Sequence, residues 1–241
     1  MTTKYRIPKT ALSMALLGLT SLHSFAESPK AKNTRPNILF IAVDDLKPNT
    51  GAYGDRLAKT PGMDRLANEG IVFERSYCQQ AICAATRASI MTGMRPDRTR
   101  VWDLITDFRQ VNPNAISMPQ YFKSMGYETA AMGKIYHMGS AGPGHDAPSW
   151  SVPYEDAKCP TYVLPNSINA RGKGKATECA DVPDETYADG ALTKMAIKSL
   201  EKLSKVDKPF FLAVGFHKPH LPFVSPKKYG DVYDRRICSP Q

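Results

Sequence analysis

Apolar residues gather in runs along the chain, and the longest runs have the character of buried strands. Residues 36–43 read Pro-Asn-Ile-Leu-Phe-Ile-Ala-Val and are apolar from the third position onward. Residues 209–216 repeat this pattern, and shorter runs lie at 71–73 and 129–132. Long continuous runs of this kind predict strands covered on both faces, as in a parallel sheet.

Between these runs, the pattern is typical of helices. One helix is predicted to begin at a Thr-Pro pair and end at a glycine over 60–70, and another to begin at Ser-Met-Pro and end at a glycine over 117–126. Residues 184–203 predict a longer helix with one apolar face. That face consists of Leu192, Met195, Ala196, Leu200 and Leu203. Strands that alternate with helices predict an α/β fold with a largely parallel sheet flanked by helices.

The first residues have the three parts of a secretory signal. Positive residues precede an apolar run at 11–22, and small residues suited to cleavage follow at 24–26. The run is too short for a comfortable membrane span, and a buried N-terminal helix is the alternative. We therefore expect a signal peptide at 1–26 and a polar linker at 27–35. The chain would be exported to an oxidising periplasmic or extracellular compartment, with no membrane span after cleavage.

Composition adds two points to this picture. The 241 residues are 42% hydrophobic and 23% charged, as in ordinary globular domains. The net charge of +9 suits an anionic substrate, and no array of basic and aromatic residues indicates a nucleic-acid partner. The five cysteines are an odd number, so at least one is unpaired. Cys159 and Cys179 bracket a polar part of the long loop at 138–183, and we expect them to form a disulfide that restrains it.

Ionisable residues follow three of the predicted strands. Asp44 and Asp45 end the first, and two adjacent carboxylates there favour a divalent cation with oxygen ligands over a solvated turn. The other two strand ends supply Lys134, His137, His217, Lys218 and His220. Because ligands bind beyond the carboxyl ends of strands in open parallel sheets, we expect these side chains to share one site.

A cysteine and an arginine lie four residues apart at the start of a further predicted helix, over 83–93. Cys83 would lie at the helix N-terminus, where free backbone N–H groups favour anions, and Arg87 one turn above it. The alternative is a buried helix with an incidental cysteine and a solvated arginine. Together with the strand ends, the pattern predicts a site for a small tetrahedral anion. Arg87 and Lys134 would neutralise its oxygens, and a histidine would protonate the leaving oxygen.

Four stretches carry a resemblance to a known family. Residues 36–46, 83–93, 133–137 and 217–223 resemble the type I, formylglycine-dependent sulfatases of the alkaline-phosphatase superfamily. The Gly-Lys-x-x-His and His-Lys-Pro-His-x-Pro-Phe runs, with the two cysteines before the long helix, are most similar to the iduronate-2-sulfatase branch. The resemblance implies that 36–230 form the N-terminal part of a sulfatase catalytic domain.

The same resemblance implies a mechanism. Cys83 would be oxidised to formylglycine by a maturation enzyme, and the hydrated aldehyde would attack the sulfur of a sulfated small molecule or glycan. One calcium ion would be held by Asp44, Asp45 and the modified residue 83, while Arg87 would stabilise that residue and the cation site. The residues implied to contact sulfate or donate a proton are Lys134, His137 and His220, with His217 and Lys218 as further substrate candidates.

Two departures from the family pattern bear on these expectations. Ala85 stands where the modification motif usually has proline, which is a known variant and bears on which maturation enzyme acts. The later Asp-His or Asp-Asn element and the further lysine of the family do not follow His220, and 231–241 form an atypical tail. We therefore expect an incomplete metal site and an uncovered sheet edge.

Two other functions fit parts of the pattern. A phosphomonoester or phosphodiester hydrolase of the same superfamily would stabilise a similar tetrahedral anion, although cysteine rather than serine or threonine at position 83 favours sulfate. A truncated, inactive remnant, or an anion-binding module with a partial calcium site, would account for the missing element. The residues do not specify which sulfated sugar is bound.

Overall fold

The computed structural model describes residues 35–234. The expected signal peptide, nearly all of the linker and the end of the tail, with Cys238, lie outside these residues. Within the described range, no helix has both the length and the apolar character that a membrane crossing requires.

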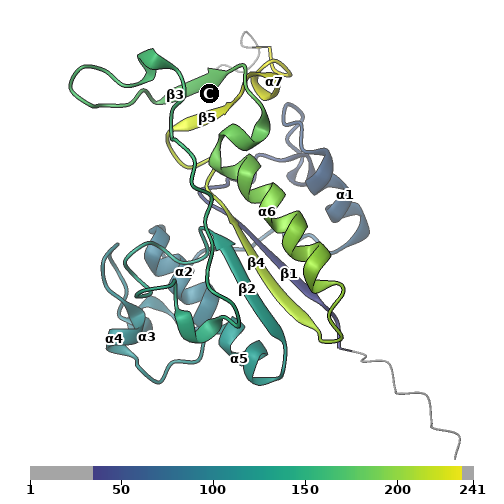
Figure 1. Ribbon diagram of the computed structural model, residues 1–241, viewed down its shortest axis with the longest axis vertical. Coiled ribbons are helices and arrows are strands. Elements are labelled where there is room, and N and C mark those ends of the chain that lie inside the picture. Colours follow the sequence, from purple (N-terminus) through teal and green to yellow (C-terminus); the bar gives the residue numbers. More distant parts are fainter. Residues whose placement is uncertain (1–34, 235–241) are drawn as a thin grey trace, which may run out of the picture. The chain divides into compact units, whose positions relative to one another are not determined.

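Three parallel strands form the main sheet, in the order β1 (Ile38–Val43), β4 (Phe210–Phe216) and β2 (Glu128–Gly133) (Figure 1). The central strand β4 is buried from Phe210 to Gly215. Helices pack on this sheet, so the predicted α/β fold with a parallel sheet flanked by helices is confirmed.

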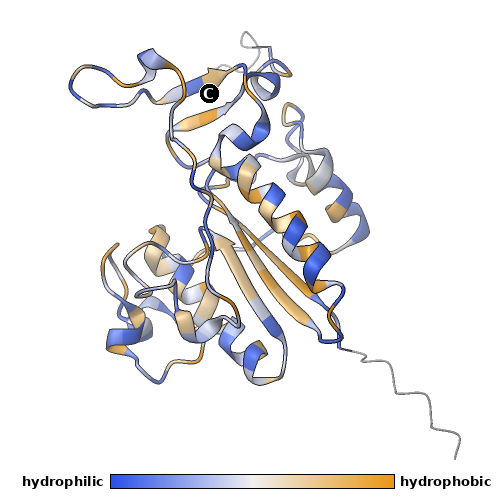
Figure 2. Cartoon of the chain, in the orientation of Figure 1, coloured by the Kyte–Doolittle hydropathy of each residue, from blue (hydrophilic) through white to orange (hydrophobic). Residues whose placement is uncertain are grey.

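Alternate residues of the strands build two cores, one on each face of the sheet. Phe211 lies in the core against α2 (Cys83–Thr92) and α5 (Met118–Ser124). Its neighbour Leu212 lies in the opposite core, against α6 (Ala188–Leu203). The predicted apolar face of α6 forms this contact, and its polar residues face outward (Figure 2).

β1 differs from the predicted two-sided burial. Phe40 packs into the core beneath α2 and α5, but Leu39 and Ile41 on the other face are 46% and 47% exposed. The reason is that α6 packs over β4 and β2 and does not extend over β1. β1 is also an edge strand within residues 35–234, as expected for an uncovered sheet edge.

Residues 71–73 do not form the predicted strand. Ile71 and Phe73 are 83% and 71% exposed, and no strand pairs with this segment in the described part of the chain. Three apolar residues form too short a pattern to distinguish a strand from an exposed connection.

The other predicted helices are present. α5 begins after Ser117, whose hydroxyl accepts a hydrogen bond from the Gln120 N–H at 3.2 Å in a capping box. α6 begins at Ala188, later than predicted, because a 3₁₀ turn precedes it. The remaining helices are α1 (Pro61–Glu69), α3 (Pro96–Thr99), α4 (Phe108–Val111) and α7 (Lys227–Gly230), with 3₁₀ turns at Gly51–Tyr53, Ala147–Ser149, Pro165–Ser167 and Asp184–Thr186.

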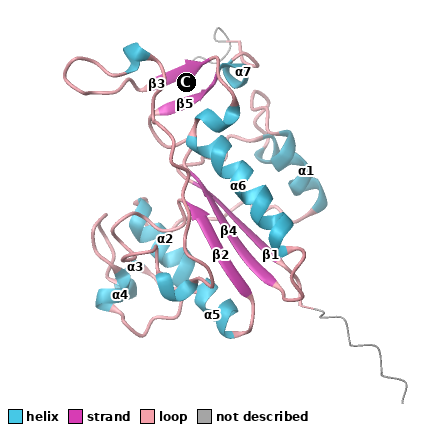
Figure 3. Ribbon diagram, in the orientation of Figure 1, coloured by secondary structure: helices cyan, strands magenta, loops and turns pink. Residues whose placement is uncertain are grey.

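The long loop contains a strand that the sequence pattern does not show. β3 (Thr177–Ala180) pairs in parallel with β5 (Phe223–Pro226) to form a second, two-stranded sheet (Figure 3). Glu178 of β3 is buried, and its carboxylate accepts hydrogen bonds from the backbone N–H groups of Val163 at 2.9 Å and Leu164 at 3.0 Å. This carboxylate restrains the loop from within.

The expected Cys159–Cys179 disulfide is absent from the structure. Both residues are free thiols. Cys159 donates toward the carbonyl of Glu185, whereas Cys179 donates toward that of Lys227. The two thiols lie against different backbone carbonyls and are therefore not brought together for a bond.

Candidate active site

The parallel register of the main sheet brings distant segments of sequence to one edge. Val43 of β1 lies opposite Phe216 of β4, and Gly133 of β2 lies opposite Gly215. The residues that follow these strands therefore emerge side by side, as the sequence predicted.

Two glycines permit an unusually close approach at this edge. A Cβ atom on Gly215 would lie 2.2 Å from the carbonyl oxygen of Lys134, and one on Gly133 would lie 2.2 Å from the carbonyl oxygen of Gly215. Gly133 also has a φ of 68°, which L side chains rarely adopt. The backbone N–H of Lys134 donates to the Gly215 carbonyl at 2.8 Å, so the two glycines fix the position of the Lys134 backbone.

Asp44 is the centre of the charged cluster. It is 4% exposed, and its two carboxylate oxygens accept from Arg87 Nη2 at 2.7 Å and from Lys134 Nζ. Burial opposes ionisation, but hydrogen bonds from Lys134 and Arg87, and their charges, hold the pKa of Asp44 below its usual value. The carboxylate is therefore ionised at neutral pH and neutralised by two cations.

Arg87 is buried on α2, not solvated. Besides Asp44, it donates to the backbone carbonyls of Lys134 and, at 3.1 Å, Ile135. The guanidinium thus ties α2 to the end of β2 and to the end of β1 at once. The sequence predicted that Arg87 and Lys134 point toward a bound anion. In this structure both side chains pair with Asp44 instead.

Cys83 is the first residue of α2, as predicted. Its thiol lies 3.8 Å from Asp44 Oδ1 and 4.0 Å from Asp45 Oδ1. Burial raises the pKa of the Cys83 thiol, and the charge of Asp44 raises it further. The thiol is consequently neutral at pH 7 and is a weak nucleophile in this form.

His220 lies close to Cys83, and His137 lies within range of the charges of Lys134 and Arg87. His220 Nε2 lies 3.8 Å from Asp45 Oδ2, and ligand atoms of Asp44, Cys83 and His220 lie within 4.8 Å of one another. The pKa of His137 is lowered by burial and by the positive charges of Lys134 and Arg87. The buried Nδ1 of His137 has no hydrogen-bond partner among the described residues.

The side chains around residue 83 offer both oxygen and sulfur to the expected calcium ion. Calcium prefers several oxygen ligands, and the carboxylates of Asp44 and exposed Asp45 can supply some of them. A thiol does not, whereas an aldehyde hydrate at residue 83 would supply oxygen. These residues therefore fit part of a calcium site when residue 83 carries oxygen in place of sulfur.

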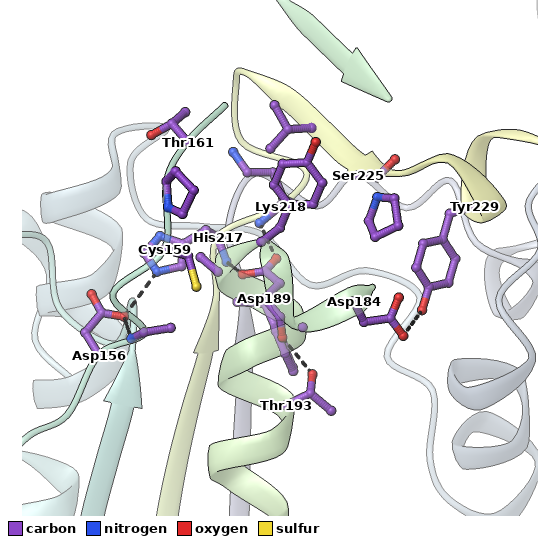
Figure 4. A pocket seen from close by; sticks show the side chains of 18 of the residues that line it. Asp156, Cys159, Thr161, Asp184, Asp189, Thr193, His217, Lys218, Ser225 and Tyr229 are labelled. Atoms are coloured by element: carbon purple, nitrogen blue, oxygen red, sulfur yellow. Dashed lines mark hydrogen bonds and ion pairs between the residues drawn. The ribbon is translucent and has the colours of Figure 1, made fainter. Parts of the chain in front are cut away.

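His217 and Lys218 do not join this cluster through their side chains. His217 Nε2 pairs with Asp156 at 3.6 Å (Figure 4). Lys218 Nζ donates to the carbonyls of His220 and Pro222 at 2.7 and 2.8 Å. Burial lowers the pKa of Lys218. Lys218 thus stabilises the turn that carries His220, and its direct contact with substrate stays a prediction.

Asp189 was missed by the sequence reasoning. Its carboxylate oxygens accept from the backbone N–H groups of His217 and Lys218, both at 2.8 Å. Asp189 belongs to the first turn of α6, so α6 holds the chain as it leaves β4. An acidic residue near a helix start is common and carries no sign of this tertiary contact.

Comparison with known proteins connects this geometry to a family. A family model described as Sulfatase matches residues 36–237. Iduronate 2-sulfatase of Mus musculus is 41% identical over 223 residues, which cover 88% of this chain and 40% of the mouse protein. Iduronate 2-sulfatase of Homo sapiens is 38% identical over 241 residues, covering 94% and 44%. The chain therefore spans less than half the length of these relatives.

Solved structures agree on the fold. The structure of BT4656 in complex with D-glucosamine-2-N,6-O-disulfate aligns with a TM-score of 0.54 and 26% identity, covering 77% of this chain and 35% of that one. The phosphonate monoester hydrolase of Silicibacter pomeroyi aligns with a TM-score of 0.62 over 86% of this chain and 46% of that one. Its identity is 19%, so this second likeness concerns the fold alone.

Proposed function

The chain belongs to the sulfatase family, and from this premise we propose that it hydrolyses sulfate esters at residue 83. The observation that carries the proposal is the position of Cys83, at the N-terminus of α2 and beside Asp44 and Asp45. No other cysteine of residues 35–234 lies in such a cluster.

The reacting group in this proposal is formylglycine, made from Cys83 by a maturation enzyme. Its hydrated aldehyde supplies a hydroxyl nucleophile and a second hydroxyl that allows sulfate to be released afterwards. The neutral thiol of unmodified Cys83 has neither property, which supports the need for modification. The free N–H groups of the first turn of α2 would stabilise negative charge near that nucleophile.

The remaining residues of the cluster divide between positioning and charge stabilisation. Arg87 donates to the carboxylate of Asp44 and to the backbone carbonyl of Lys134, so it positions both residues. When sulfate is bound, the ammonium group of Lys134 would also interact with the sulfate oxygens. His137 and His220 would contact sulfate, and His220 would donate a proton to the leaving oxygen. The position of His220 beside Cys83 and that of His137 among the charged groups of the cluster support these roles.

A calcium ion at this site would be held by Asp44, Asp45 and residue 83. Such an ion supplies Lewis-acid stabilisation of a developing negative charge. The two carboxylates support its binding, and Arg87 and Lys134 keep Asp44 ionised in its absence.

We further propose that the substrate is a sulfated glycan or a small sulfated molecule, and that the chain is exported. The likeness to two iduronate 2-sulfatases supports a sugar sulfate. The positive, apolar and small-residue pattern of residues 1–26 supports export.

Mass spectrometry of one tryptic peptide tests the key step. Residues 76–87 follow Arg75, end at Arg87 and contain both Cys78 and Cys83. In chain produced together with a formylglycine-generating enzyme, we expect conversion at Cys83 and an alkylatable thiol at Cys78. Cys83→Ala should abolish hydrolysis of an aryl sulfate, whereas Cys78→Ala should retain it. Unmodified cysteine at position 83 in the presence of the maturation enzyme would contradict the proposal.

The same preparation separates sulfate from phosphate chemistry. Hydrolysis of an aryl sulfate should exceed that of the matching aryl phosphate. Faster, zinc-dependent cleavage of the phosphate would instead identify a phosphoester hydrolase.

A further inference from the structure

A cavity of about 460 Å³ lies along α2, apart from the charged cluster. One wall is the chain segment 76–79, which precedes the helix, and the opposite wall is α2 with the residues directly after it. Asp44, Cys83 and Lys134 do not line this cavity. Its size lies within the range of about 300–1,000 Å³ that is common for small-molecule pockets. The cavity is therefore large enough for a ligand of its own.

The helical period gives α2 two different faces. One face carries residues that are buried in the core, which are Ala84, Ala85, Ala88 and Met91. The residues that line the cavity recur three and four positions apart on the other face, and these are Thr86, Ser89, Ile90 and Gly93. The side chain of Ser89 is therefore directed toward the cavity.

Ser89 presents an unused hydrogen-bonding group to this cavity. The residue is 6% exposed, and its Oγ atom has no hydrogen-bond partner within residues 35–234. A buried hydroxyl without a partner is unfavourable, so a ligand that completes its hydrogen bonding would bind here with a gain in free energy. Thr86 on the same face differs, because its Oγ1 already donates to the carbonyl of Gln80.

A thiol and a guanidinium line the same cavity. Cys78, in the segment 76–79, is an exposed cysteine with a free thiol. Arg95 follows α2 and is also exposed, and in the described part of the chain no carboxylate or carbonyl pairs with its guanidinium. Ile90 and Met94 add apolar surface. The cavity thus combines a reactive sulfur, an unpaired hydroxyl and a positive charge.

We propose that this cavity binds a small thiol compound with peptide amide and carboxylate groups, and holds it through a mixed disulfide with Cys78. Ser89 would bond to an amide group of the ligand, and Arg95 would pair with a carboxylate. The site lies outside the charged cluster and is independent of sulfate hydrolysis.

The reaction is a thiol–disulfide exchange with the disulfide form of this compound. The Cys78 thiol releases its proton to water, and its sulfur attacks one sulfur of the ligand's disulfide. A sulfur–sulfur bond to Cys78 forms as the ligand's bond breaks, and the other half of the ligand leaves as a thiolate that takes up a proton. Cys78 is oxidised and the leaving half is reduced, so the ligand's own disulfide is the oxidant.

Competition between two thiols of the same chain tests the site. Cys179 is the reference, because it is an exposed free thiol outside this cavity. The positive charge of Lys227 lies near Cys179, so a general attraction of anions would act at the reference as well. The purified chain is treated with glutathione disulfide, which has amides and carboxylates, or with cystamine, a cationic disulfide that has neither.

Mass spectrometry of tryptic peptides 76–87 and 176–194 measures the two rates, and fragmentation separates an adduct at Cys78 from one at Cys83. With glutathione disulfide, we expect the adduct to form at Cys78 at least about fivefold faster than at Cys179. With cystamine, Cys78 should have no advantage. Equal rates with glutathione disulfide, or the same preference with cystamine, would overturn the proposal, because exposure of the thiol alone would then explain the reaction.

Three variants assign the preference to the cavity. Ser89→Ala and Arg95→Met should each slow the reaction of Cys78 with glutathione disulfide by about threefold or more. Arg98→Met, at an exposed position outside the cavity, should leave the rate unchanged. Ser89→Ala removes an unpaired hydroxyl and should not lower the free energy of unfolding, so a slower reaction would report a lost ligand contact. An unchanged rate in Ser89→Ala or in Arg95→Met would overturn the proposal.

Discussion

At the scale of single residues, the balance of charge at Asp44 depends on Arg87. The Arg87 guanidinium is buried and bonds to Asp44 and to two backbone carbonyls. Replacing it with methionine leaves those acceptors unpaired and Asp44 with Lys134 as its remaining cation. Because removing one partner of a buried ion pair is strongly destabilising, we expect Arg87→Met to lower the free energy of unfolding by about 3–5 kcal/mol.

Urea unfolding followed by circular dichroism measures this change. Arg98→Met is the matched control, since Arg98 is exposed, and it should change the free energy of unfolding by no more than about 0.5 kcal/mol. A loss of stability in Arg87→Met as small as in the control would show that Arg87 serves substrate binding alone.

Glycine at position 215 is required for a different reason. A methyl group there would overlap the backbone of Lys134, which cannot move without disturbing the sheet edge. We expect Gly215→Ala to lower the free energy of unfolding by about 1–3 kcal/mol and to displace Lys134 from Asp44. The same change at Gly62 in α1 meets no atom within 4 Å and should raise the free energy of unfolding by up to about 1 kcal/mol. Thermal unfolding of both variants compares the opposite signs directly; equal effects would refute the steric explanation.

The residues of the cluster divide into those that the sequence could place and those that it could not. The sequence placed Asp44, Lys134 and His220 correctly at one edge of the sheet. Parallel strands bring their carboxyl ends together, and this does not depend on the conformation of the loops. Cys83 could be placed because a helix start faces that edge. The side chains of His217 and Lys218 are directed at Asp156 and at backbone carbonyls, and not at Asp44, because the direction of a side chain after a strand depends on tertiary contacts such as those of Asp189.

At the scale of elements, β3 depends on the ionisation of Glu178. Burial opposes its charge, but hydrogen bonds from Ser167, Tyr187 and two backbone N–H groups outweigh burial and lower the pKa of Glu178 below 4.5. A lowered folded-state pKa means that the unfolded chain takes up the proton first as pH falls. The stability from Glu178 is therefore fully present well above pH 4.5 and is lost as the pH falls below that value.

Urea midpoints at about pH 6 and pH 3.5 test this dependence. Glu178→Gln should be destabilised at pH 6 and should lose less stability on acidification than the parent chain. Glu74→Gln, at an exposed position, should keep the dependence of the parent. Identical acid sensitivity in Glu178→Gln and the parent would mean that other carboxylates hold the loop.

The connection between α6 and the turn after β4 is carried by Asp189. We expect Asp189→Ala to lower the rate of aryl-sulfate hydrolysis at least tenfold, because two backbone N–H groups lose their acceptors and His220 is no longer held. Asp189→Asn keeps one accepting oxygen and should restore part of the rate. Asp207→Ala, at an exposed position, should have the parent rate. A full rate in Asp189→Ala would show that Lys218 alone maintains the turn.

At the scale of the whole molecule, the sequence of a strand alone does not determine whether both of its faces are buried. β4 and β1 have similar apolar runs, yet β4 is buried on both faces and β1 on one. The difference arises because α6 is centred on β4 and β2. The sequence therefore predicted the class and the direction of the sheet, and the extent of its cover depends on helix placement.

The uncovered face of β1 leads to a prediction about association. Leu39 and Ile41 present apolar side chains beside a strand edge that is unpaired within residues 35–234. Exposed apolar strands at a sheet edge favour pairing with other chains. We expect the purified chain to self-associate with rising concentration, and the Leu39→Thr/Ile41→Thr variant to do so much less. Threonine keeps β propensity, so the free energy of unfolding of the monomer should change by less than about 1 kcal/mol.

Sedimentation velocity over a hundredfold range of concentration measures this association. The matched control is Leu104→Thr/Ile105→Thr, which makes the same chemical change at two exposed positions outside any strand. The control should associate as the parent does, because its apolar side chains have no strand edge beside them. Equal association in all three proteins would locate the contact elsewhere. An equal reduction in both variants would instead show that general surface hydrophobicity, and not the edge of β1, drives association.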